Sequence, residues 1–299
     1  MQSRDKSFIE FFTNNTYLIP EYQRPYEWED SSHISDFWQD LYQQLNDFNE
    51  SSNYDQKLFL GVVILEEVPK KIDTYQVVDG QQRITTLFIL LVAIEQILKK
   101  LASIKKEYSK EITTDYFDGY NLINMQSNIR QLISTQDDKG STSKIHFQAH
   151  ALIEKLMNYI CTEGWDRKFI NKKFKSQKNV KKVFDYFEER LNELVGIKYE
   201  TVTTTVDGKE KKNKKLIDIS QISPEKITKL IKALRSIMFI TLTVPTREEA
   251  YELFERVNAR GKELDVGDLL KNHLFSQGAT LINDGEEETT SLEEAWREI

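Results

Sequence analysis

The chain has 299 residues, of which 30% are charged and 39% hydrophobic, and its net charge is −7. This length is enough to bury a sizeable core in one large domain or two smaller ones. The acidic balance argues against a protein that coats nucleic acid non-specifically, although it is compatible with a local basic surface. A single cysteine excludes an intramolecular disulfide, and the longest apolar run is too short to span a bilayer. We therefore expect a cytoplasmic protein.

The N-terminal part of the chain contains signals for both helices and strands. The expected elements are a helix at 7–12, a strand at 17–19, a helix at 31–48, strands at 59–65 and 75–78, and a helix ending near 104. A loop over 20–28, stiffened by two prolines, separates the first strand from the second helix. The two apolar strands are predicted to pair as a β-hairpin. We therefore predict an α+β domain over residues 1–104.

The remaining residues, 105–299, are predicted to form a mainly helical domain. The expected elements are helices at 149–160, 167–174 and 180–194, a β-hairpin near 197–219, a helix from 223, a strand at 238–244, and two helices within 246–275. The hairpin is rich in lysine, and its role stays open. The chain ends within a short amphipathic helix, so we expect it to be a fragment of a longer protein.

The segment Val77-Val78-Asp79-Gly80-Gln81-Gln82-Arg83 joins an apolar strand to the long helix. Gly80 allows a tight turn, and the free N–H groups of the helix start favour an anion. Arg83 lies in the first helical turn, where its guanidinium can bind phosphate oxygens. Asp79 would repel a bare anion, which indicates a metal ion such as Mg²⁺ between this acid and a phosphate, or a hydrogen bond to a sugar or base. The pattern predicts a pocket for the phosphates of a nucleotide or nucleic acid.

A purely structural interpretation of the same residues is also open. Asp-Gly is a common turn, so Asp79 could cap the following helix while Arg83 pairs with a surface acid.

Two further segments carry polar groups that are suited to a ligand. The loop 20–28 presents Gln23 and Arg24 on a stiff backbone, beside aromatic residues that could stack on a base. Near the other end of the chain, Asn258 and Arg260 lie where one predicted helix ends and another begins. We expect the helices within 246–275 to close on the phosphate pocket.

Together these segments resemble the ParB-like N-terminal domain of GmrSD-type, modification-dependent restriction endonucleases. The resemblance rests on residues 19–28, on Leu60-Gly61, on 78–87 and on 254–272. It implies a ParB/sulfiredoxin-like domain that binds and hydrolyses a nucleoside triphosphate in bacterial, anti-phage restriction of DNA, often DNA with modified bases. Many members carry a C-terminal HNH-type nuclease domain, and no such motif is present in this chain.

We expect the candidate residues to have the following roles. Asp79, Gln82, Arg83 and Arg24 are the candidate catalytic residues, and Asp79 is also the candidate ligand of Mg²⁺. The candidate nucleotide-binding residues are Gln23, Gly80, Gln81, Thr85, Asn258 and Arg260. Without a Walker lysine the chain is not a P-loop enzyme. Two rivals use the same pocket: a DNA-binding or modified-base-sensing module without turnover, and a metal-dependent DNA phosphodiesterase.

Overall fold

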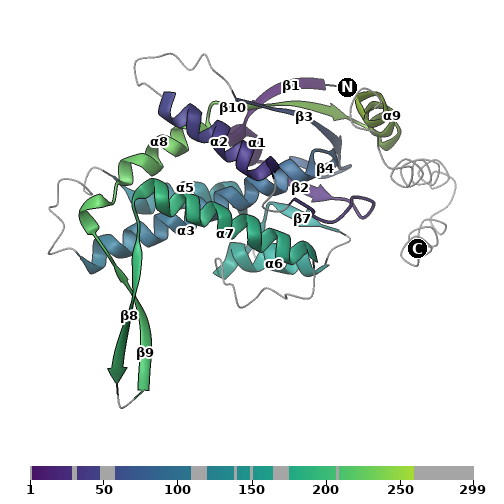
Figure 1. The fold of residues 1–299 in the computed structure, drawn as a ribbon. Coiled ribbons are helices and arrows are strands. Elements are labelled where there is room, and N and C mark those ends of the chain that lie inside the picture. The colour runs from purple at the N-terminus through teal and green to yellow at the C-terminus, as the bar shows by residue number, and fades with distance from the viewer. Residues whose placement is uncertain are drawn as a thin grey trace.

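A mixed sheet forms the frame of the protein (Figure 1). The computed structural model describes residues 2–28, 32–47, 58–108, 120–137, 140–148, 151–163, 175–206 and 209–258. Six strands follow the order β1-β10-β3-β4-β2-β7. Their bounds are β1 Gln2–Ser7, β2 Thr16–Ile19, β3 Leu58–Glu67, β4 Thr74–Asp79, β7 Ile145–Phe147 and β10 Ile237–Val244. β3 pairs antiparallel with β4 and parallel with β10, so the sheet joins segments from both ends of the sequence.

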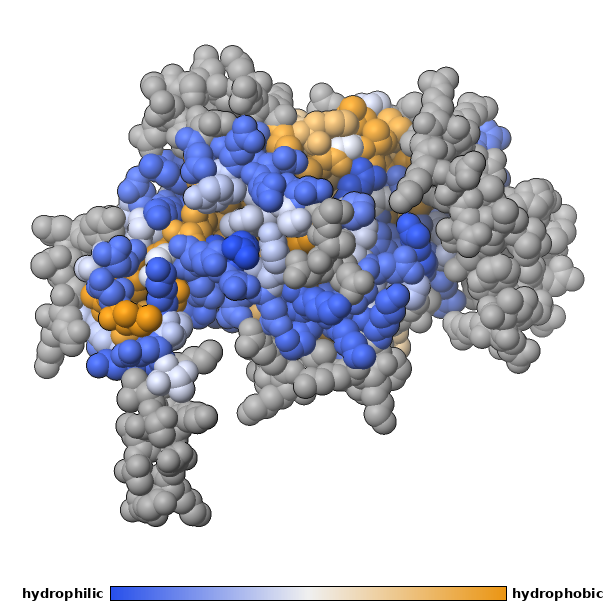
Figure 2. All heavy atoms as spheres, viewed as in Figure 1, coloured by the Kyte–Doolittle hydropathy of each residue, from blue (hydrophilic) through white to orange (hydrophobic). Residues whose placement is uncertain are grey.

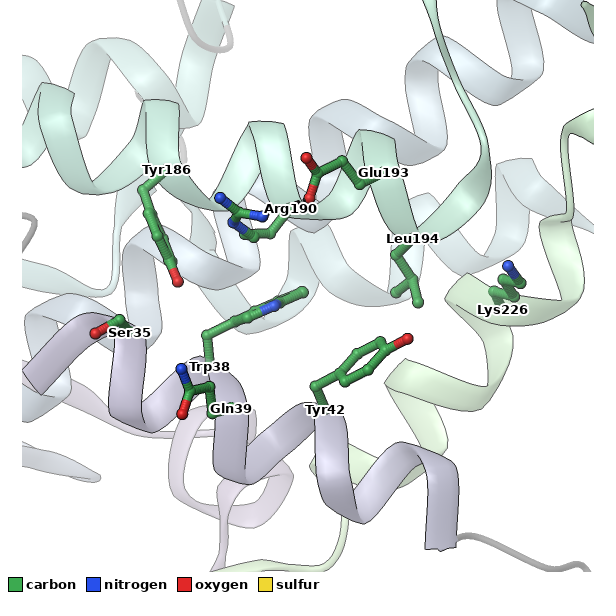
Figure 3. Close-up of a pocket in the computed structure, with 9 residues that line it drawn as sticks. All are labelled: Ser35, Trp38, Gln39, Tyr42, Tyr186, Arg190, Glu193, Leu194 and Lys226. Carbon is green, nitrogen blue, oxygen red and sulfur yellow. Dashed lines mark hydrogen bonds and ion pairs between the residues drawn. The ribbon is translucent and has the colours of Figure 1, made fainter. Parts of the chain in front are cut away.

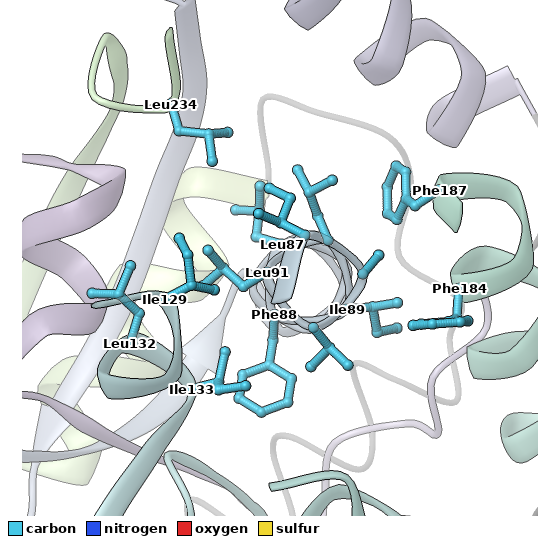
Figure 4. Packing of buried hydrophobic residues seen from close by; sticks show 14 of the residues in the cluster. Leu87, Phe88, Ile89, Leu91, Ile129, Leu132, Ile133, Phe184, Phe187 and Leu234 are labelled. Atoms are coloured by element: carbon cyan, nitrogen blue, oxygen red, sulfur yellow. The ribbon is translucent and has the colours of Figure 1, made fainter. Parts of the chain in front are cut away.

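Helices cover the sheet, and one of them, Gln81–Glu107, lies at the centre of the others. They are α1 Phe8–Thr13, α2 Ser32–Asp47, α3 Gln81–Glu107, α5 Leu122–Ile133, α6 Ala151–Glu163, α7 Lys175–Val195, α8 Pro224–Leu234 and α9 Arg247–Asn258. The 27-residue α3 is apolar on every side over 87–94, and that stretch is buried throughout. Figure 4 shows its side chains packed against α5, α7 and α8. Each fully buried leucine or phenylalanine here contributes about 1.5–3 kcal/mol, so this packing holds α3 firmly in place.

Two small hairpins complete the described structure. β5 (Ser134–Asp137) pairs with β6 (Gly140–Ser143), and β8 (Tyr199–Val206) pairs with β9 (Lys209–Leu216). The β8–β9 hairpin occupies the range predicted for it and projects from the body as an arm (Figure 1). A single 3₁₀ turn, Ile219–Gln221, leads from the arm to α8.

The prediction of a mixed α and β protein is confirmed, as is the antiparallel pairing of β3 with β4. Residues 105–148 are less helical than expected, because β5, β6 and β7 lie there and β7 extends the main sheet. β10 lies between β1 and β3, so residues on both sides of position 104 share one sheet. The domain division at residue 104 and the ParB/sulfiredoxin-like fold remain predictions. The expected helix at 167–174 and the second helix of 246–275 lie outside the described residues.

Among the described helices, none combines the length and apolar character needed to cross a membrane. This includes α3, whose buried stretch faces other helices instead.

Candidate functional site

The turn between β4 and α3 places a carboxylate beside the start of a helix. β4 ends at Asp79, and Gly80 is the N-cap of α3 with a φ of +98° and no side-chain cap bond. The positive φ requires glycine, and a Cβ there would also lie 3.1 Å from Cγ2 of Val63. The N-cap residue is Gly80, so the structural interpretation is wrong about capping by Asp79, but Arg83 does pair with an acid, which is Asp79 itself. The first N–H groups of α3 and the positive end of its dipole are therefore suited to an anion.

Arg83 binds the backbone of β3 as well as the acid at the turn. Its Nη1 donates to the carbonyl of Leu60 and its Nη2 to the carbonyl of Val62, each at 2.8 Å. Nη2 also lies 3.4 Å from Oδ2 of Asp79. The residue between the two carbonyls is Gly61, with a φ of +95°, and a Cβ there would lie 2.3 Å from Nη1 of Arg83. Gly61 thus leaves the space in which the guanidinium sits, and Arg83 fixes the position of Asp79.

The effect of burial on the carboxyl group of Asp79 is only partly offset by the groups around it. Burial raises the pKa of Asp79, whereas Arg83, the N–H of Gly80 and Arg24 lower it by a smaller amount. The side chain of Asp79 is 27% exposed, so a ligand can reach it. A cation bound at this carboxylate would favour its charged form further.

Three glutamine amides hold the loop 20–28 against the turn. Nε2 of Gln23 donates to the carbonyl of Val78 at 2.6 Å, and Nε2 of Gln81 donates to the carbonyl of Arg24 at 2.5 Å. The amide of Gln82 accepts from the N–H of Glu27 at 3.0 Å and donates to the carbonyl of Pro25 at 3.1 Å. The amide of Gln82 is thus engaged at both its oxygen and its nitrogen with loop backbone.

More distant groups secure the same loop. The hydroxyls of Tyr26 and Thr86 lie 2.7 Å apart, and Nδ2 of Asn179 on α7 donates to the carbonyl of Glu27 at 3.1 Å. The loop is therefore fixed to both α3 and α7.

Arg24 is the accessible arginine of this loop. Its side chain is 58% exposed and lies 3.5 Å from Oε2 of Glu27, a pair of small energetic value at such exposure. Its charge lowers the pKa of Asp79, so it lies within electrostatic reach of the turn. Arg24 can change partner at little cost, in contrast to the anchored Arg83.

Two buried oxygens on the first turns of α3 lack hydrogen bonds within the described structure. They are Oε1 of Gln81 and Oγ1 of Thr85, which are one helical turn apart. Leaving such a group unpaired costs about 1–3 kcal/mol, which a ligand that donates hydrogen bonds would recover. Sequence reasoning named both residues as nucleotide contacts, and that role stays a prediction.

Helix α9 packs beside the turn. Ala250 joins Ile64, Val78 and Val244 in a small apolar cluster on β3, β4 and β10. At the start of α9, the guanidinium of Arg247 lies 5.5 Å from the ring centre of Tyr22 in the 20–28 loop. Asn258 is the last residue of α9, but its side chain and all of Arg260 lie outside the described residues.

The segments that were expected to meet do meet, but several of their side chains bind groups that the sequence does not reveal. Asp79, Gly80 and the loop 20–28 come together as expected, and α9 lies next to them. The contacts of Arg83 and Gln82 with backbone carbonyls were not foreseen, because carbonyl acceptors leave no mark on the sequence. The glycine at position 61 was the available signal, since a glycine within a strand indicates a bulge or a close approach.

Comparison with known proteins places the chain in a family. No curated protein gives a significant match to the chain. The family described as "GmrSD restriction endonuclease, N-terminal domain" matches residues 8–275, a span that contains every candidate residue of the site. The resemblance stated from the sequence motifs is thereby confirmed, and the chain belongs to the family of GmrSD restriction endonuclease N-terminal domains.

Proposed function

We propose that the Asp79–Arg83 turn binds a nucleoside triphosphate and hydrolyses it, and that this step regulates or powers DNA cleavage by a cytoplasmic restriction protein. The observation that carries the proposal is the uncapped start of α3 beside a partly buried carboxylate and an accessible arginine. The family adds the DNA-restriction context. In this proposal the nuclease activity belongs to an HNH-type domain or partner that acts on DNA, which in some cases is modified.

The phosphates would lie at the N-terminus of α3. Gly80 has no side chain to obstruct their approach, and the first N–H groups of the helix would donate to phosphate oxygens. Oε1 of Gln81 and Oγ1 of Thr85 would accept hydrogen bonds from donors on the sugar or base.

The two arginines would have different tasks. Arg24 would leave Glu27 and stabilise the charge that develops on the transferring phosphoryl group. Arg83 would act mainly by positioning Asp79, because both of its terminal nitrogens already donate to β3 carbonyls. Gln82 would likewise act through the loop that it holds, and Asp79 would orient the attacking water.

The donor set at the turn fits Mg²⁺. This ion commonly binds one or two carboxylates together with substrate phosphates and water, and Asp79 supplies one carboxylate. Within the described part of the chain no three histidine, cysteine or acidic residues form a metal cluster, so the phosphates would complete the site. When bound, the ion would neutralise charge on the phosphates, and Asp79 would hold it next to the start of α3.

Phosphate release from ATP, GTP, CTP and UTP with Mg²⁺ tests the proposal, with and without DNA. We expect Asp79→Asn and Arg24→Gln to lower turnover by a factor on the order of 10²–10³. Arg235→Gln, which removes an exposed arginine after α8, is the matched control and should keep wild-type turnover. Absence of both nucleotide binding and turnover would refute the proposal.

A plasmid-nicking assay with Mg²⁺ or Mn²⁺ separates the rivals. Metal-dependent nicking that Asp79→Asn abolishes would identify a DNA phosphodiesterase. Salt-sensitive DNA binding without turnover would identify a sensing module.

A further inference from the structure

A cavity of about 570 Å³ lies between α2, α7 and the start of α8 (Figure 3). Its volume falls within the usual range of small-molecule sites. None of the residues that line it belongs to the Asp79 turn or to the loop 20–28. It is therefore a separate site from the proposed nucleotide pocket.

Three aromatic rings form much of the wall of this cavity. Trp38 and Tyr42 are one turn apart on α2, and Tyr186 faces them from α7 (Figure 3). Trp38 is only 6% exposed and packs against Phe187 at a ring-centre distance of 6.2 Å, so its ring is rigidly held. Tyr42 is 45% exposed and stands at the mouth. Tyr42 therefore offers the most accessible aromatic face of this wall, and the buried Trp38 supports it from below on the same helix.

Polar groups occupy the remaining wall. The guanidinium of Arg190 lies 5.4 Å from the ring centre of Tyr186, and its Nη1 contacts Oε2 of Glu193 at 2.6 Å. Its Nε is buried and has no hydrogen-bond partner within the described structure. Lys226 adds a positive charge from α8. The cavity thus combines aromatic rings with one carboxylate and two cations.

The cavity also lies at the base of the β8–β9 arm. α7 ends at Val195, just before β8, and α8 begins shortly after β9, so the two helices that anchor the arm also line the cavity (Figure 1). The sequence of β9 holds five lysines among eight residues, in a chain whose net charge is −7. A lysine-rich β-ribbon suits a nucleic-acid backbone, since a two-stranded ribbon fits a duplex groove and lysine neutralises phosphates.

We propose that this cavity receives a nucleobase of a DNA strand while the β8–β9 arm follows the phosphates. Stacking on an aromatic face contributes about 1–3 kcal/mol per base, and the partly exposed guanidinium of Arg190 would donate to the edge of the base. The base would come from a single strand or be turned out of a duplex. The inference rests on the DNA-restriction part of the proposed function and is independent of nucleotide hydrolysis.

Two oligonucleotides test the proposal on the full chain by fluorescence anisotropy. One is a strand of abasic sites with a single central base, and the other is the same strand without that base. We expect the single base to raise affinity roughly ten-fold, and Tyr42→Ala to abolish that gain while leaving the affinity for the abasic strand unchanged. Phe59→Ala removes an aromatic residue of similar exposure on β3, outside the cavity, and should keep the gain.

Equal affinity of the wild-type protein for both strands would overturn the proposal. Equal loss in Tyr42→Ala and Phe59→Ala would also overturn it, because the effect would then not belong to the cavity. Asp79→Asn keeps the two proposals apart: it should lose turnover and retain the gain from the single base. Tyr42→Phe, which keeps the ring, should behave as the wild type.

Discussion

Replacing Gly61 by alanine tests whether this glycine exists to make room for Arg83. The new Cβ would lie 2.3 Å from Nη1 of Arg83, at a residue whose φ is +95°. The guanidinium must move away from this Cβ, although it donates hydrogen bonds to the backbone carbonyls of Leu60 and Val62. Both hydrogen bonds to these carbonyls are then lost or distorted.

Two terms set the expected size of the effect. A left-handed φ costs a residue with a side chain about 1–2 kcal/mol. Each charge-assisted hydrogen bond is worth about 1.5–3 kcal/mol, and partial exposure of the Arg83 side chain allows water to replace some of this. We therefore expect Gly61→Ala to lower the free energy of unfolding by about 3–5 kcal/mol.

A double-mutant cycle with Arg83→Ala, measured by urea denaturation, isolates the steric term. Without the guanidinium, alanine at position 61 should cost only the backbone strain of about 1–2 kcal/mol. The coupling energy between the two positions should be about 2–3 kcal/mol. An equal cost of Gly61→Ala in both backgrounds would refute the reasoning, because the strain would then lie in the backbone alone.

Three further predictions concern other parts of the chain. Thr85→Val should leave stability unchanged or raise it by about 1 kcal/mol, since it removes an unpaired buried hydroxyl, and should weaken nucleotide binding in a calorimetric titration. Burial opposes ionisation of Glu154, but hydrogen bonds from His146 and the backbone lower its pKa below 4.5, so its stabilisation is lost as the pH falls through that lowered value. Glu154→Gln should therefore reduce the acid sensitivity of urea unfolding. Lys212→Gln with Lys214→Gln should reduce the salt slope of single-strand binding by about 1.4, and an unchanged slope would exclude phosphate contacts by both lysines.

The elements that were predicted correctly are those with strong local signals. β3, β4 and α3 carry long apolar runs, and Asp79-Gly80 marks the turn between a strand and a helix. β1 was missed because its sequence is polar, and a strand at the edge of a sheet needs no alternating pattern. The position of β10 beside β3 was also missed, since parallel pairing joins residues far apart in the chain.

In the site, too, local sequence features were predictable, whereas contacts between distant segments were not. The meeting of the loop 20–28 with the turn was inferred from the kinds of residue that each segment carries. The tasks of Gln82 and Arg83 depend on backbone carbonyl groups in other segments. Every residue has such a carbonyl, so no sequence pattern reveals which of them a side chain will bind. The cavity between α2 and α7 was not foreseen for a related reason, because each helix alone reads as an ordinary amphipathic helix.

The place of β10 inside the sheet has a consequence during synthesis on the ribosome. β1 and β3 emerge early, but the strand that joins them is translated only at residues 237–244. Until then the edges of β1 and β3 that pair with β10 stay unpaired, although α5 and α7 have already been translated and can cover α3. Long-range closures of this kind are slow and come late in folding. The turn at Asp79 therefore gains its full support only after β10 and the start of α9 have been translated, because both pack against β3 beside it.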